Sequence, residues 1–95
     1  AGITGLALSA AATYASRNIR VNVVAPGLTR TPLTARLTQN EASAKASMAM
    51  HPLGRLGEPD DVARAIEFFL DPCNSWITGQ VLAVDGGLST LKLKG

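Results

Sequence analysis

Apolar residues fill most of the first 17 positions and recur at the three- and four-residue spacing of a helix. Ile3, Leu6, Ala10 and Tyr14 mark one face of this helix. The opposite face is also apolar or carries small residues, as in helices that other parts of a protein cover on both sides. The pattern therefore predicts a helix over residues 1–17 that is buried on both faces.

Two later stretches have the composition of buried strands. Residues 19–25 (IRVNVVA) are rich in β-branched side chains and end at Pro26, and residues 80–85 end at a pair of glycines. A long connection joins the two stretches, so we expect the strands to run parallel.

The connection carries two helical patterns. Residues 32–50 form a weak one, and residues 59–71 form a stronger one that starts with Pro59, where a missing N–H costs nothing. The inner stripe of the stronger pattern consists of Val62, Ala65, Ile66 and Phe69. The order of helix, strand, helical connection and strand predicts an α/β fold and the end of a longer alternation.

The amino-acid composition indicates how the core is built and which classes of protein are excluded. Of the 95 residues, 46% are hydrophobic but only 4% are aromatic, so the core must consist mainly of Ala, Val, Leu and Ile. Such a core buries little area per residue, which predicts a piece of a larger domain or an obligate oligomer. The net charge is only +2 and the basic residues are scattered, which argues against nucleic-acid binding.

The cysteine count and the apolar runs predict a cytoplasmic protein without a metal or a membrane partner. Cys73 is the single cysteine and cannot form an internal disulfide, and with His51 it makes no metal cluster. No apolar run reaches the roughly 20 residues of a membrane span. The apolar start lacks the basic segment of a signal peptide.

Three motifs follow one another along the chain: RVNVVAPGLTRTPL, PLGRLGEPDDVA and WITGQVLAVDGG. In this order and spacing they resemble the C-terminal half of short-chain dehydrogenases/reductases, and the resemblance covers residues 1 to about 88. It implies a Rossmann-type, doubly wound parallel sheet. It also implies NAD or NADP as cofactor and a small alcohol, ketone or aldehyde as substrate.

The resemblance also implies where the catalytic groups of the family lie. Its Tyr and the Lys four residues later belong to the helix that continues as residues 1–17, which places the Lys directly before Ala1. The Ser, the Asn and the glycine-rich loop lie further upstream, so we expect no catalytic residue in this chain. Tyr14 is followed four positions later by Asn18 instead of Lys, which favours packing over catalysis. A natural truncation, a proteolytic cut, a cloned fragment and a partial structure all remain open as origins.

The strongest candidate site is the segment after the first predicted strand, formed by Pro26, Gly27, Leu28, Thr29 and Thr31. Ligands of open α/β folds bind at the carboxyl ends of parallel strands. By resemblance, the backbone at Thr29 pairs with the nicotinamide carboxamide, and the Thr31 hydroxyl adds a contact. The family usually has Ile or Val in place of Thr29, a change that a backbone contact survives. The alternative is an ordinary Pro-Gly turn.

Residues 32–50 match the substrate-covering lid of the family. Leu33, Leu37, Met48 and Met50 are the candidates for contact with an apolar substrate. The alternative is a surface helix that packs on its own domain.

The remaining polar candidates are expected to have structural roles. His51 lacks a Ser, Cys or Asp partner at a recognisable spacing, so we expect a surface or capping residue. Asp60 and Asp61 diverge by about 100° on a helix, and the helix dipole explains them better than paired catalysis. Asp85 begins a tight turn, and Cys73 has no basic neighbour that would activate a thiol.

Two functions from different classes remain open. In the first, this chain belongs to an oxidoreductase and supplies the nicotinamide-side loop, the substrate lid and an oligomer surface, while a missing N-terminal segment supplies the catalytic groups. In the second, the chain is a non-catalytic oligomerisation module from a truncated dehydrogenase. Both predict a homo-oligomer or a missing segment as the partner, and neither predicts activity from this chain alone.

Overall fold

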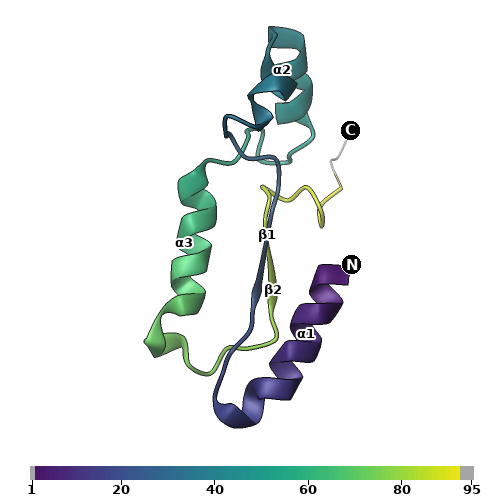
Figure 1. The fold of residues 1–95 in the computed structure, drawn as a ribbon. Coiled ribbons are helices and arrows are strands. Elements are labelled where there is room, and N and C mark those ends of the chain that lie inside the picture. The colour runs from purple at the N-terminus through teal and green to yellow at the C-terminus, as the bar shows by residue number, and fades with distance from the viewer. Residues whose placement is uncertain (1, 93–95) are drawn as a thin grey trace.

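The computed structural model describes residues 2–92, without the side chains of residues 37 and 38. Its helices and strands are α1 (Gly2–Tyr14), β1 (Val23–Pro26), α2 (Glu41–Ala49), α3 (Pro59–Leu70) and β2 (Val81–Val84). Short 3₁₀ turns cover Ala15–Arg17, Thr34–Thr38 and Pro72–Asn74. Figure 1 shows the two strands at the centre, with α3 on one side, α1 on the other and α2 beyond their carboxyl ends. The predicted α/β fold class is confirmed.

The two strands form a parallel sheet in which Val23 pairs with Val81 and Pro26 with Val84. The ladder begins four residues later than the predicted strand over residues 19–25. Side chains replace the ladder before Val23, because Thr78 Oγ1 accepts a hydrogen bond from the Val21 N–H at 3.1 Å and Asn22 Oδ1 accepts one from the Gln80 N–H at 3.0 Å. The strand composition therefore continues into a stretch that bonds partly through side chains, while the Val21 carbonyl still accepts a hydrogen bond from the Gly79 N–H at 2.9 Å.

Within the described residues, helix α1 is covered on one face only, and its other apolar face is open to water or to another chain. Only Ala11 is buried, and Ile3 and Leu6 keep 78% and 73% of their surface exposed. The side that turns inward consists of small residues, Thr4, Ala7, Ala10 and Ala11. Small side chains permit a close approach to the sheet, whereas the large ones predicted to mark the packed face point away from it.

Both ends of α3 are fixed by side chains. At its start, Glu58 and Asp61 form a reciprocal capping box beside Pro59. At its end, the Arg20 guanidinium donates hydrogen bonds to the Phe69 carbonyl at 2.7 Å and to the Ile77 carbonyl at 3.1 Å. Arg20 therefore links the segment before β1 to the carboxyl end of α3 and satisfies the Phe69 carbonyl, which the helix end leaves free.

The core of this chain is thin. Ala11, Leu56 and His51 are the buried side chains among the described residues, and Val81 and Leu82 of β2 remain 46% and 41% exposed. Within the described residues neither strand is buried as expected, because β1 is half-buried and ends at an exposed Pro26, while most of β2 is exposed. The described residues extend over 50 × 29 × 24 Å. Within residues 2–92, every helix is too short or too polar to span a membrane.

Candidate functional site

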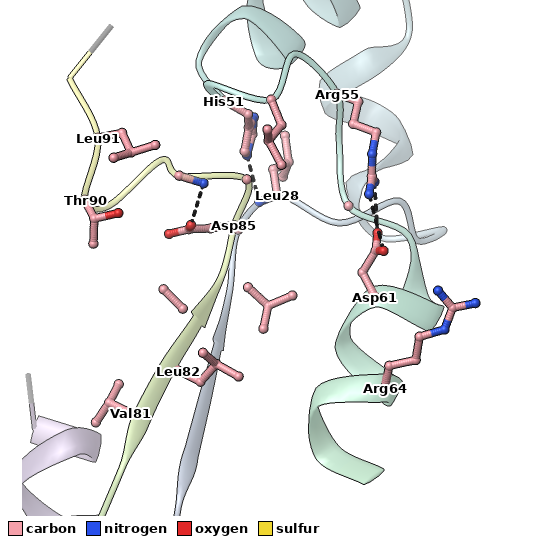
Figure 2. A pocket seen from close by; sticks show the side chains of 17 residues that line it. Leu28, His51, Arg55, Asp61, Arg64, Val81, Leu82, Asp85, Thr90 and Leu91 are labelled. Atoms are coloured by element: carbon pink, nitrogen blue, oxygen red, sulfur yellow. Dashed lines mark hydrogen bonds and ion pairs between the residues drawn. The ribbon is translucent and has the colours of Figure 1, made fainter. Parts of the chain in front are cut away.

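Three loops converge at the carboxyl ends of the two strands (Figure 2). One follows β1 and contains Gly27 and Leu28, one precedes α3 and contains His51, and one follows β2 and begins with Asp85. Together with β2 and the first turns of α3 they line an open cavity of about 690 Å³. Of the five residues predicted to bind the cofactor, Gly27 and Leu28 line this cavity, whereas Pro26, Thr29 and Thr31 do not.

The loop after β1, residues 26–31, is held from one side by the loop before α3. The Gly57 N–H donates to the Leu28 carbonyl at 2.9 Å, and the Arg30 N–H donates to the Gly57 carbonyl at 2.8 Å. These two bonds form a short parallel bridge between Thr29 and Gly57. The segment is thus more than a free Pro-Gly turn, because its backbone is paired like a strand.

Thr34 holds the same loop from the other side. Its hydroxyl donates to the Thr29 carbonyl at 2.6 Å and accepts from the Thr31 N–H at 2.9 Å. The Thr34 N–H in turn donates to the Thr31 hydroxyl at 3.2 Å. Sequence reasoning missed Thr34, although threonines three residues apart often bond each other's backbone at the start of a helical turn.

One backbone donor of the loop has no partner among the residues that the structure describes. The N–H groups of Leu28 and Arg30 are both hydrogen-bonded, whereas the Thr29 N–H between them has no acceptor within residues 2–92. Backbone donors in folded proteins are nearly always paired with protein, water or ligand. Among the described residues, the Thr29 N–H is therefore a donor of this loop that is left for water or a ligand.

Gly27 lies where the loop crosses the end of β2. A Cβ atom at this position would lie 2.8 Å from the Asp85 Cβ and 2.9 Å from the Asp85 Cα. Real Cβ atoms do not approach backbone so closely, so only glycine lets the two strand ends meet. The Gly27 N–H donates to the Val84 carbonyl at 3.0 Å and extends the ladder by one bond.

Asp85 organises the turn that follows β2, in agreement with its predicted structural role. Its carboxylate accepts hydrogen bonds from the Gly87 N–H at 3.0 Å and from the Ser89 N–H at 3.1 Å. The hydrogen bonds from Ser89, with that from Gly87, hold the pKa of Asp85 below its usual range. Gly86 and Gly87 have φ angles of 60° and 94°, which other residues rarely adopt.

For His51, the expectation of a surface residue is wrong, whereas the expected capping role agrees with its contact to the last turn of α2. Its side chain is only 3% exposed and lies between α2 and the loop after β1. Nδ1 lies 2.9 Å from the Ser47 carbonyl, and Nε2 accepts a hydrogen bond from the Leu28 N–H at 3.3 Å. The local sequence around His51 does not predict its contact with the Leu28 N–H, because Leu28 lies 23 positions earlier in the chain.

The two neighbouring aspartates at the start of α3 have different surroundings. Asp61 accepts hydrogen bonds from the Arg55 guanidinium at 2.9 Å and from the Glu58 N–H at 2.8 Å, whereas Asp60 is exposed. The Arg55 guanidinium, together with the Glu58 N–H, lowers the pKa of Asp61 to about 2. As predicted, Asp61 serves the start of the helix, and the pair does not act as two facing carboxylates.

We predict that Asp61→Asn makes the start of α3 less sensitive to acid. A carboxyl group whose pKa is depressed by folding stabilises the folded state above its unfolded pKa, about 4, and this contribution is lost as the pH falls towards about 2. Melting temperatures measured as the pH is lowered give the loss of stability, and the NMR chemical shift of the Asp61 carboxyl carbon gives its pKa. Asp60→Asn is the matched control, and an equal effect of both substitutions would contradict the assignment.

The residues predicted to contact substrate do not gather in the cavity. Leu33 is 87% exposed, Met50 is 60% exposed and Met48 is half-buried, while the Leu37 side chain lies outside the described residues. All of them belong to the segment beyond the carboxyl ends of the strands, where α2 begins with Asn40 as its N-cap. Helix α2 packs on the 3₁₀ turn Thr34–Thr38 of the same segment, and Leu33 and Met50 leave apolar surface exposed.

Tyr14 and Cys73 both lie at the surface of the described residues. The Arg17 guanidinium lies 5.9 Å from the centre of the Tyr14 ring, and the ring is 40% exposed. Cys73 is exposed, and its N–H bonds to the Asp71 side chain that caps the turn. Within residues 2–92, His, Cys, Asp and Glu do not form a group of three that could hold a metal ion.

Comparison with known proteins gives one consistent family. The family model described as enoyl-(acyl carrier protein) reductase matches residues 1–89. The carbonyl reductase family member 4 of Danio rerio is 50% identical over 91 residues, 96% of this chain and 35% of that protein. The 3-oxoacyl-(acyl-carrier-protein) reductase of Thermotoga maritima is 44% identical over 88 residues, 93% of this chain and 35% of that protein. The chain thus spans about a third of the length of these relatives.

Solved structures agree with this result. A short-chain type dehydrogenase/reductase from Mycobacterium ulcerans superposes with a TM-score of 0.85 at 38% identity, over 92% of this chain and 32% of that one. A 4-hydroxyisoleucine dehydrogenase complexed with NADH gives 0.90 at 32% identity, over 96% and 37%. The protein ElxO with NADP bound gives 0.83 at 33% identity, over 94% and 36%.

Proposed function

The chain belongs to the short-chain dehydrogenase/reductase family, and we propose that it forms the nicotinamide-side part of an NAD(P)(H)-dependent oxidoreductase. The reaction would interconvert small alcohols with ketones or aldehydes. The names of the relatives, a carbonyl reductase and a 3-oxoacyl reductase, support this substrate class. The observation that carries the proposal is the Thr29 N–H, which has no acceptor among the described residues. It belongs to a loop that hydrogen bonds hold in place at the carboxyl end of a parallel strand.

The loop after β1 fits a nicotinamide cofactor, which supplies or accepts the hydride when it is bound. The free Thr29 N–H would donate to the carboxamide oxygen, and the Thr29 carbonyl would accept from the carboxamide nitrogen in competition with Thr34. The Thr31 hydroxyl would add a polar contact beside them. Gly27 and Leu28 would keep the backbone in place, and Pro26 would end the strand. Structures of relatives with NADH and with NADP support both cofactors as candidates.

The apolar surface beyond the strands fits a substrate lid. Leu33 and Met50 expose most of their surface, and the proposal assigns that surface, with Leu37 and Met48, to the substrate. An apolar lid would exclude water from the reacting carbonyl.

A second function is favoured by a different observation. Large apolar side chains are exposed on α1 and on the loop before β2, including Ile3, Leu6 and the 98% exposed Trp76. Such surfaces mark contacts with other chains or with further parts of the same protein. We therefore propose that the chain also supplies oligomer contacts, and a non-catalytic oligomerisation module is the alternative to the oxidoreductase.

The test compares two samples: the protein with whatever residues flank this chain in the cell, and the 95-residue chain alone. We predict that the first binds NADH or NADPH and oxidises it with some members of a panel of ketones and aldehydes. The second is predicted to show no turnover, because a catalytic acid alone contributes about 10²–10⁴-fold and Tyr14 has no basic partner four residues later.

Calorimetric titration with both nucleotides and absorbance at the reduced-nicotinamide band provide the measurements. Turnover that co-purifies with the 95-residue chain would contradict the proposal that this chain lacks the catalytic groups. A complete protein that binds neither nucleotide but self-associates would favour the oligomerisation module.

A further inference from the structure

We propose that His51 is a positioning residue that couples the substrate lid to the cofactor loop through one neutral tautomer of its ring. The inference rests on the proposed function, which assigns residues 26–31 to the cofactor and residues 32–50 to the lid. His51 belongs to neither set in the sequence motifs, yet it is the buried side chain that lies between them.

The contacts of His51 join two segments of the chain. The carbonyl of Ser47 lies in α2, one turn before His51, and the Leu28 N–H lies in the loop after β1. The ring is 3% exposed, so water does not compete for either contact. A displacement of the end of α2 therefore moves the acceptor of the Leu28 N–H.

Both contacts are with backbone groups, and this fixes the proton on the ring. The Ser47 carbonyl can only accept, so Nδ1 must carry a hydrogen. The Leu28 N–H can only donate, so Nε2 must be bare. Only the neutral Nδ1–H tautomer satisfies both partners, because a hydrogen on Nε2 would face the Leu28 N–H.

His51 acts on the proposed cofactor site through its hydrogen bond with the Leu28 amide. His51 fixes the peptide before Leu28, Gly57 fixes the Leu28 carbonyl, and Thr29 follows directly with its free N–H. Without the acceptor at Nε2, the Leu28 N–H is left unpaired beside the packed end of β2. The loop then has to shift to satisfy it, and the Thr29 donor shifts with it.

Charged groups of the loops at this end of the sheet have hydrogen-bond or ion-pair partners other than His51. The hydrogen bonds of the Asp85 carboxylate go to the Gly87 and Ser89 N–H groups. Arg30 pairs with Glu58 at 3.0 Å and Arg55 with Asp61. The ring is therefore held by two backbone groups, and it has no nucleophile to activate within residues 2–92.

Three substitutions in the full-length protein separate the two contacts. In His51→Gln, the side-chain oxygen reaches the position of Nε2 and accepts from Leu28, while the bond to Ser47 is lost. In His51→Asn, the side-chain amide reaches the position of Nδ1 and donates to Ser47, but nothing reaches Leu28. His51→Leu removes both contacts.

We expect His51→Asn and His51→Leu to weaken the binding of NADH or NADPH about tenfold, and His51→Gln to stay within about threefold of the unaltered protein. Dissociation constants from calorimetry, with melting temperatures measured beside them, give the readout. A purely structural histidine would lower the melting temperature in all three variants without this order of affinities. Equal dissociation constants for the Asn and Gln variants would overturn the proposal.

Imidazole nitrogen shifts in NMR of the unaltered protein give an independent measurement that needs no variant to fold. We expect a protonated Nδ1 and a bare Nε2, and a Leu28 amide shift that changes in His51→Asn more than in His51→Gln. A protonated Nε2 overturns the coupling. If the unaltered protein binds neither nucleotide, the proposed function fails, while these shifts still decide whether His51 links the lid to the loop.

Discussion

Gly27→Val is expected to lower the affinity of the full-length protein for NAD(P)H by more than tenfold and to destabilise the fold. A Cβ at this position would lie 2.8 Å from the Asp85 Cβ and 2.9 Å from the Asp85 Cα, and backbone cannot move aside as a flexible side chain can. Overpacking of this kind costs about 1–3 kcal/mol. The loop that presents the Thr29 amide would have to separate from the end of β2.

Gly5→Ala is the matched control for this substitution. A Cβ on Gly5 meets nothing within 4 Å, so this change is expected to leave affinity unaltered and to stabilise α1 slightly. Calorimetric affinities and melting temperatures of both variants make the comparison. Unchanged affinity in Gly27→Val would show that residues 26–31 do not form the cofactor loop.

The 95-residue chain alone is expected to self-associate or to remain poorly folded at micromolar concentration. Its radius of gyration is 15.9 Å, whereas a compact domain of about 100 residues has a radius of about 13 Å. Ile3, Leu6 and Trp76 expose 78%, 73% and 98% of their surface. Little apolar area is thus buried against the ordering entropy of roughly 1–2 kcal/mol per residue.

The sheet adds a second cause of association. β1 and β2 pair with each other along one edge only, and the outer edges of both strands present unpaired backbone groups within residues 2–92. Sedimentation equilibrium measures the outcome. The double substitution Ile3→Glu and Leu6→Glu should reduce association through α1, while Lys45→Glu on α2 should not. A compact monomer with a cooperative melting transition would contradict this burial pattern.

The sequence by itself determined the fold class and the order of the elements. Hydrophobic periodicity, Pro26 after a run of β-branched residues, and Pro59 beside Asp61 are local signals, and each corresponds to an element or an end in the structure. They are readable because the backbone conformation of a helix or strand depends mainly on neighbours within a few positions. The motif spacing likewise predicted the family.

Only the tertiary structure decided the contacts that bring distant segments together. The start of the β1 ladder depends on Thr78, 57 positions after Val21, and the role of His51 depends on Leu28, 23 positions before it. The packed side of α1 is its small-residue side, because what matters is how closely a backbone can approach the sheet. The need for glycine at position 27 arises from Asp85 on the neighbouring strand. Such requirements come from packing between segments, which periodicity along one segment does not record.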